Sequence, residues 1–106
     1  MSAHLCHAPG CTRTIPPRLF ACPAHWRLVP RWLQAWLLKE YRSGQERDKK
    51  PSARYCAVQT RCRLDLARLE RSWDRSLLFG IEQELSRWIG HAELTEAESV
   101  RLREGL

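Results

Sequence analysis

The sequence predicts a mainly α-helical protein that begins with a treble-clef-like zinc knuckle and hairpin and continues with two to four helices, one of them very long. Cysteine and histidine residues form two short pairs in the first quarter of the chain, and apolar residues recur at helical steps over most of the rest. At 106 residues, the chain is large enough for one modest core. We therefore expect a single domain over residues 1–106.

The two short pairs predict a metal site. Four residues separate Cys6 from Cys11, and two residues separate Cys22 from His25. Three thiolates and an imidazole are a usual ligand set for tetrahedral structural zinc. In a small chain the binding free energy of such an ion, on the order of 10–16 kcal/mol in finger peptides, becomes folding free energy. We predict a zinc module over residues 1–28 that binds one Zn²⁺ through Cys6, Cys11, Cys22 and His25.

Other roles for the cysteines and histidines are less favoured than this ligand set. His7 could replace Cys6 as a ligand, but the thiolate is the stronger zinc donor. Cys56 and Cys62 are six residues apart on a predicted helix, which turns them about 120° away from each other, so we interpret them as core thiols. Disulfides are not favoured, because the first residues show no secretory signal and thiols inside the cell stay reduced.

A helix is predicted over residues 30–42, with Pro30 in its first turn. Before it, residues 12–20 suggest two short extended arms around a turn at Pro16 and Pro17. Ser43 and Gly44 should end the helix, and a polar loop should follow it at residues 45–50. Its apolar face should consist of Trp32, Leu33, Trp36, Leu37 and Tyr41.

A very long helical pattern covers residues 52–89, with Ser52 as a candidate N-cap. Apolar residues repeat along it at steps of three or four, namely Cys62, Leu66, Leu69, Trp73, Leu77, Ile81, Leu85 and Trp88. A continuous rod would measure roughly 55 Å. Two interpretations stay open: the pattern breaks near Gly80 into two helices that fold back, or the rod pairs with a second copy as a homodimer.

A short last helix is predicted over residues 95–104. Thr95 and Glu98 have the spacing of a capping box, and Val100 and Leu102 should point inward. No segment approaches the ~20 apolar residues that cross a bilayer, so we expect no membrane partner. These observations favour a soluble protein of the cytoplasm.

The net charge of +6 is unevenly distributed: residues 1–54 contain ten Lys and Arg against three Asp and Glu, and residues 55–106 contain eight against nine. On the long helix, pairs such as Arg61 and Asp65 have helical spacing and predict a solvated, self-compensated face. A second basic set has no matching acids nearby in sequence. It comprises Arg13, Arg18, Arg27, Arg31, Arg47, Lys49, Lys50 and Arg54, and it is our candidate for contacts with phosphates.

Several of these motifs occur together in a known order. The run from Cys22 to Trp26 is followed by Leu28 and Pro30, then by Tyr-Arg-Ser-Gly-Gln-Glu at residues 41–46 and Lys-Pro-Ser-Ala-Arg-Tyr at residues 50–55. Together with the Cys-x4-Cys pair, this order resembles a family of small, uncharacterised zinc-module proteins encoded by tailed bacteriophages and prophages. The resemblance covers roughly residues 5–70, and Ser43 departs from it where the family has proline. It implies a phage-type origin, a zinc module and a bacterial host cytoplasm, but no activity.

Catalysis is disfavoured, because four good ligands leave no open position on the metal and no acidic residue occurs between Met1 and Lys39. We therefore name no catalytic residue and predict a protein that acts by binding. The leading interpretation is an accessory factor that binds DNA or RNA. The alternative is a modulator of a bacterial host machine, such as transcription or an anti-phage defence complex, that binds an acidic host protein.

Overall fold

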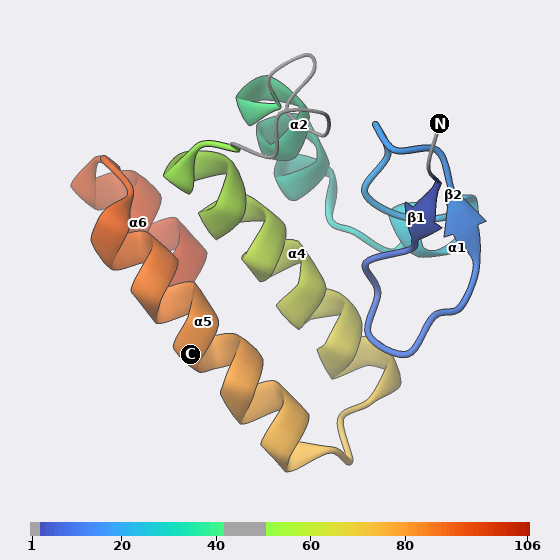
Figure 1. Ribbon diagram of the computed structural model, residues 1–106. Helices are drawn as coiled ribbons and strands as arrows, with labels where there is room; N and C mark the ends of the chain where they lie inside the picture. The colour runs from blue at the N-terminus through green and yellow to red at the C-terminus, as the bar shows by residue number, and fades with distance from the viewer. Residues whose placement is uncertain (1–2, 42–50) are drawn as a thin grey trace.

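The computed structural model describes residues 3–41 and 51–106. A small cysteine-rich module at the N-terminal end lies beside a set of helices, as Figure 1 shows. The prediction of a short hairpin with a Cys3His cluster followed by helices is confirmed.

Two short strands, β1 (His4–Leu5) and β2 (Thr14–Ile15), pair antiparallel, with His4 opposite Ile15. The predicted turn at Pro16 and Pro17 is present, and in it the Leu19 N–H donates to the Pro16 carbonyl at 3.1 Å. Of the two extended arms predicted around it, the arm before the prolines contains β2, whereas residues 18–20 form no strand. Strand β2 pairs with β1, which precedes Cys6, because the Cys-x4-Cys loop between the two strands reverses the chain.

Helix α1 (Pro23–Trp26) follows the hairpin, and α2 (Arg31–Glu40) follows α1. Pro30 is the N-cap of α2 rather than a residue of its first turn, and the helix ends one residue before Tyr41, whose backbone is extended. The predicted apolar face is present, with Leu33 and Leu37 buried. The predicted helix end at Ser43 and Gly44 and the loop at residues 45–50 lie outside the described residues.

The long helical pattern is two helices, α4 (Ala53–Glu70) and α5 (Arg75–His91), which pack against each other. The predicted break near Gly80 is wrong, because the chain turns at residues 71–74 and Gly80 lies inside α5. Asp74 is the N-cap of α5, and its carboxylate accepts the Leu77 N–H at 3.1 Å. The fold-back interpretation is thus the correct one for this stretch, and a homodimer stays untested.

Helix α4 is the central element of the fold. It contacts α2, α5 and α6, and in Figure 1 it runs diagonally between the cysteine-rich module and α5. Its buried side chains therefore lie on several faces, and they are Ala57, Val58, Thr60, Arg61, Cys62, Leu64, Leu66 and Ala67. Ser52 caps it as predicted, accepting the Tyr55 N–H.

The last helix, α6 (Glu96–Arg103), returns against α4 and α5. Its predicted capping box between Thr95 and Glu98 is present. Leu102 is fully buried, but Val100 is 59% exposed, so the expectation that both residues point inward is wrong for Val100.

The charged pair on α4 has a different role from the predicted one. Arg61 does contact Asp65, at 2.9 Å, but the Arg61 side chain is buried. Its guanidinium also donates to the Leu102 carbonyl at 2.7 Å. Arg61 therefore binds the C-terminal end of α6 to α4 rather than forming a solvated surface.

Candidate metal centre

Each predicted ligand lies at a defined point of the module. Cys6 follows β1, Cys11 follows a tight turn, Cys22 is the N-cap of α1 and His25 lies inside α1. Two backbone hydrogen bonds close the first loop: the Cys6 N–H donates to the Arg13 carbonyl at 2.8 Å, and the Cys11 N–H donates to the Ala8 carbonyl at 3.0 Å.

Gly10 makes this turn possible. Its φ of +84° lies in the left-handed region, where residues with a Cβ are strained. A Cβ at this position would also collide with the guanidinium of Arg71. That guanidinium donates to the Pro9 carbonyl at 3.1 Å, so the end of α4 closes over the loop.

The four ligand atoms converge. One atom each from Cys6, Cys11, Cys22 and His25 lies within 4.8 Å of every other. The His25 Nδ1 atom is 3.2 Å from the Cys22 sulfur and 3.6 Å from the Cys6 sulfur. Tetrahedral zinc with sulfur ligands at about 2.3 Å holds its donors roughly 3.8 Å apart, so the donor set fits one such ion.

The environment of the sulfurs distinguishes two of them. Burial raises the pKa of the Cys6 thiol. Burial alone would also raise the pKa of Cys22, but hydrogen bonds from His25 and Cys6 outweigh it and lower that pKa to about 6. The Cys22 N–H, in turn, donates to the Cys6 sulfur at 3.2 Å. These contacts favour the thiolate form, the form that binds metal, at Cys22.

Glu70 completes the site from a distance of 45 residues along the chain. Its Oε1 atom lies 2.6 Å from His25 Nε2, on the ring edge opposite Nδ1. A carboxylate that accepts the second N–H of a ligating histidine fixes its tautomer and orientation. Neither spacing nor periodicity indicates this contact, because Glu70 is simply the last residue of α4.

His7 is not part of the cluster of ligand atoms. Its ring stacks on Phe20 with centroids 5.4 Å apart, and burial lowers the pKa of His7 to about 4. The structure therefore brings together the set with Cys6 rather than the alternative with His7.

Cys56 and Cys62 lie on α4 and do not join the metal cluster found in the described part of the chain. Cys62 is fully buried, and burial raises its pKa. Burial raises the pKa of Cys56 as well. Cys62 is a core thiol, in agreement with the sequence interpretation, whereas Cys56 is half-buried and lies outside the core cluster.

The structure separates the predicted basic set into exposed arginines without ion pairs, one paired arginine, and residues outside the described part of the chain. Arg13, Arg18, Arg27 and Arg31 are exposed, and none of them forms an ion pair with a described residue. The structure therefore leaves four arginines of the N-terminal third open to solvent. Arg47, Lys49 and Lys50 lie outside the described residues.

Arg54 contradicts the expectation that it lacks acidic partners. Its guanidinium lies 2.9 Å from Glu40 and 2.6 Å from Glu98, and it also donates to the Glu93 carbonyl at 2.7 Å. These hydrogen bonds raise the pKa of Arg54 and lower that of Glu98 to about 2. Arg54 joins α2, α4 and α6, and its donors are occupied within the fold.

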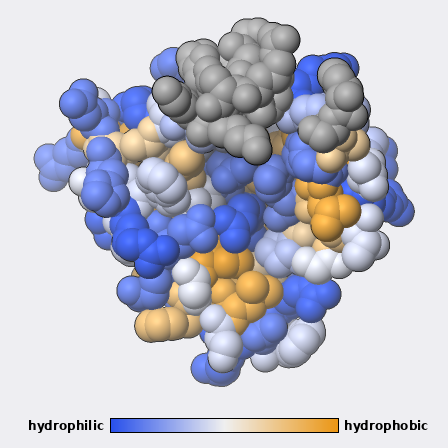
Figure 2. Space-filling view, in the orientation of Figure 1, coloured by the Kyte–Doolittle hydropathy of each residue, from blue (hydrophilic) through white to orange (hydrophobic). Residues whose placement is uncertain are grey.

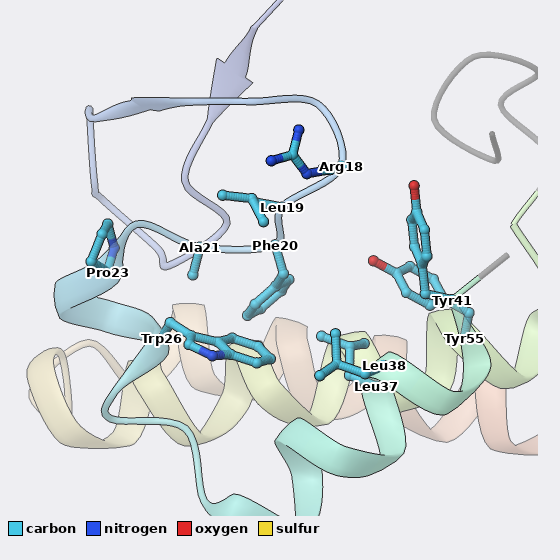
Figure 3. Close-up of a pocket in the computed structure, with 10 residues that line it drawn as sticks. All are labelled: Arg18, Leu19, Phe20, Ala21, Pro23, Trp26, Leu37, Leu38, Tyr41 and Tyr55. Carbon is cyan, nitrogen blue, oxygen red and sulfur yellow. The ribbon is translucent and has the colours of Figure 1, made fainter. Parts of the chain in front are cut away.

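A pocket of ≈ 460 Å³ lies beside the metal cluster, and sequence reasoning did not find it. Figure 3 shows Phe20, Pro23 and Trp26 of the module on one side and Leu37, Tyr41 and Tyr55 of the helices on the other. Arg18 is the one charged residue among the described residues that line it. The residues that line the pocket come from segments distant in sequence, so no local sequence pattern predicts it.

No protein-family model, curated protein or solved structure matches this chain. The resemblance to phage-encoded zinc proteins therefore stays a prediction. Within the described residues, no helix has both the length and the apolar character required to cross a bilayer.

Proposed function

We propose that this chain acts by binding, and that its zinc-organised end contacts the phosphates of DNA or RNA. The observation that supports this is the division among the arginines. Five arginines of the helical part form ion pairs within the fold, namely Arg54, Arg61, Arg63, Arg68 and Arg101. The four exposed arginines of the N-terminal third form none with the described residues.

The sequence around the site is basic. No acidic residue occurs in the first 39 residues, and Glu70, which α4 places against His25, is an acidic neighbour from elsewhere in the chain. Arg13 lies two residues after Cys11, and Arg27 lies two residues after His25. Zinc binding would therefore hold the backbone that bears these side chains in place.

Contacts of this kind position a protein on nucleic acid without reading its sequence. We therefore propose an accessory factor with little sequence preference. Its affinity should fall steeply with salt, because each neutralised phosphate releases a condensed counterion. The metal has a structural role in this proposal, since three thiolates and one imidazole fill a tetrahedral shell.

A salt titration tests the proposal. Zinc-loaded protein should bind random duplex and single-stranded DNA, with a log–log salt slope that falls by roughly one for each arginine contact removed. The double variant R13A/R27A should reduce the slope by about two. The matched control R75A/R87A removes two exposed arginines of α5 and should leave the slope unchanged. An absence of binding at low salt would refute the proposal.

A second candidate function is binding to a host protein, and the apolar pocket specifically favours it. Phosphates gain nothing from a wall of leucine and aromatic side chains, whereas the anchor residues of protein interfaces occupy such walls. A phage-type origin would make the partner a component of the bacterial host.

A further inference from the structure

The pocket beside the metal cluster has a buried base and an exposed rim. Phe20 and Leu37 line it and are 5% and 2% exposed. Leu19 and Leu38 line it as well, but they are 41% and 65% exposed. The side chains around the opening thus extend the apolar base into solvent.

The volume of ≈ 460 Å³ lies within the range of about 300–1,000 Å³ for pockets that enclose ligands. It can accept one or two large apolar side chains. Among the lining side chains, polar atoms belong to Arg18, Trp26, Tyr41 and Tyr55, and the other lining side chains are apolar. The polar edges of a nucleobase would find few hydrogen-bond partners on the apolar walls, and burying them without partners costs free energy. The lining therefore selects an apolar occupant.

The positive charge of Arg18 indicates which kind of group should lie beside the apolar occupant of the pocket. In Figure 3 the Arg18 guanidinium lies close to Leu19, on the module side of the pocket. Arg18 forms no ion pair with the described residues, and the first 39 residues contain no carboxylate. An anionic group next to the apolar anchor would pair with Arg18, whereas a cationic group would be repelled.

We infer that this pocket is a docking site for an acidic amphipathic helix of a partner protein, which inserts a large apolar side chain between Phe20 and Leu37 and places a carboxylate near Arg18. An amphipathic helix presents its anchors at three- and four-residue steps, with charges on its other face. The inference rests on the protein-binding candidate, and it shares Arg18, but not Leu38, with the phosphate-binding proposal.

Hydrophobic residues also reach the surface elsewhere, and Figure 2 shows them interrupting a mostly hydrophilic face. Leu69, Trp73 and Phe79 are large exposed side chains near the turn between α4 and α5. None of them lines the pocket. They supply controls of the same residue types outside the proposed docking site.

The test uses the zinc-loaded full chain and three fluorescein-labelled peptides of about 18 residues. One is an amphipathic helix with leucine on one face and glutamate on the other. The second has lysine in place of glutamate, and the third has the composition of the first in an order without amphipathic spacing. Fluorescence anisotropy at constant salt should show that the first peptide binds roughly tenfold or more tightly than either of the others.

Two variants and two controls locate the binding. Leu38→Ala and Arg18→Ala should each weaken binding of the acidic peptide by roughly five- to tenfold. Leu69→Ala and Arg87→Ala, which change the same residue types on α4 and α5, should leave it unchanged. Leu38 is mostly exposed, so its truncation should not disturb the core, and retained zinc content and helicity would verify this.

The outcomes separate this inference from phosphate binding. Leu38→Ala should leave DNA binding intact, because it removes no charge. Equal binding of the amphipathic and reordered peptides, no binding of the acidic peptide, or equal losses for Leu38→Ala and Leu69→Ala would each overturn the inference. If DNA binding persists in those cases, the phosphate proposal stands alone.

Discussion

At the scale of single residues, the most consequential contact is the one between Glu70 and His25. The ring is held on both edges, with Nδ1 toward the sulfurs and Nε2 at 2.6 Å from the Glu70 carboxylate. A histidine so oriented loses less freedom when it binds metal. Glu70 is therefore a positioning residue for a ligand that lies 45 residues away.

Removing this carboxylate should weaken metal binding. We predict that Glu70→Ala lowers zinc affinity by about 10- to 100-fold, the usual effect of losing such a partner. Competition with a chromophoric chelator measures the change. Glu96→Ala, which removes an exposed carboxylate at the start of α6, is the matched control. Equal affinities for Glu70→Ala and wild type would show that His25 needs no support from α4.

Glu98 should make stability depend on acid pH. The Arg54 guanidinium holds the pKa of Glu98 at about 2, below its ordinary value of 4.5. A carboxyl with a depressed folded-state pKa stabilises the fold above pH 4.5, and this contribution disappears as pH falls toward 2. The stability difference between wild type and Glu98→Gln should therefore be largest near neutral pH and shrink through this range.

Urea unfolding at pH 6 and pH 3 measures that difference. Both proteins lose zinc alike in acid, so the comparison between them isolates Glu98. Glu93→Gln is the control, because no described arginine contacts the Glu93 side chain. A Glu98→Gln difference that is the same at both pH values would contradict the assignment.

Sequence spacing could predict the metal ligands because each pair is local: the Cys-x4-Cys turn and the Cys-x2-His helix start constrain their own geometry. Glu70 and the partners of Arg54 could not be predicted in the same way. They meet through the packing of α2, α4 and α6 against one another and against the module. A single sequence shows no periodicity for such contacts.

At the scale of elements, the turn between α4 and α5 decides the fold. The apolar pattern continues across it through Leu69 and Trp73, which suggested one rod. Both residues are exposed, at 61% and 72%, so the pattern there did not mark a buried face. The stronger local signal was Asp74, an N-cap residue type directly before α5.

Removing this cap should destabilise the hairpin. We predict that Asp74→Ala lowers the free energy of unfolding by about 1 kcal/mol, because the Leu77 N–H loses its acceptor. Chemical denaturation of zinc-loaded protein measures the loss. Ser72→Ala, in the same turn and exposed, should change stability much less. If Asp74→Ala and Ser72→Ala lowered the free energy of unfolding equally, Asp74 would not be the N-cap of α5.

Gly80 gives the complementary test. A Cβ at this position meets nothing within 4 Å, and glycine inside a helix costs about 1 kcal/mol relative to alanine. Gly80→Ala should therefore stabilise the protein by roughly 0.5–1 kcal/mol, measured by the same denaturation. A break at Gly80 with the left-handed backbone of a helix C-terminus would make this variant destabilising instead.

Helix caps were the most predictable elements. Ser52 and the box of Thr95 with Glu98 act within three residues, so the sequence alone defines them. The strand pairing was not predictable in this way. The two prolines resembled the centre of a hairpin, but the true reversal is the cysteine loop, whose conformation depends on Gly10 and on Arg71 from α4.

At the scale of the whole molecule, the module and the helices are joined at the end of α4. Glu70 contacts His25, and Arg71 contacts the Pro9 carbonyl. Metal binding and the docking of the module on α4 should therefore support each other. The module and the helices share one core, which includes Cys6 and Cys22, but most of its buried residues lie on the helices, Leu64, Leu66 and Leu85 among them.

Loss of the metal should consequently unfold one part and spare the other. We predict that Cys22→Ser or His25→Ala lowers zinc occupancy and unfolds roughly the first 30 residues, while most of the helix content persists. Circular dichroism and limited proteolysis measure the two effects. Complete loss of helicity in either variant would show that the helices cannot fold without the module.

The zinc content of freshly purified, never-chelated protein tests the central claim most directly. Elemental analysis should give one zinc per chain for wild type and for a Cys56→Ser control, and much less for Cys22→Ser. A wild-type protein without bound metal, or one whose metal content does not change when Cys22 is replaced, would contradict the Cys3His site on which the account depends.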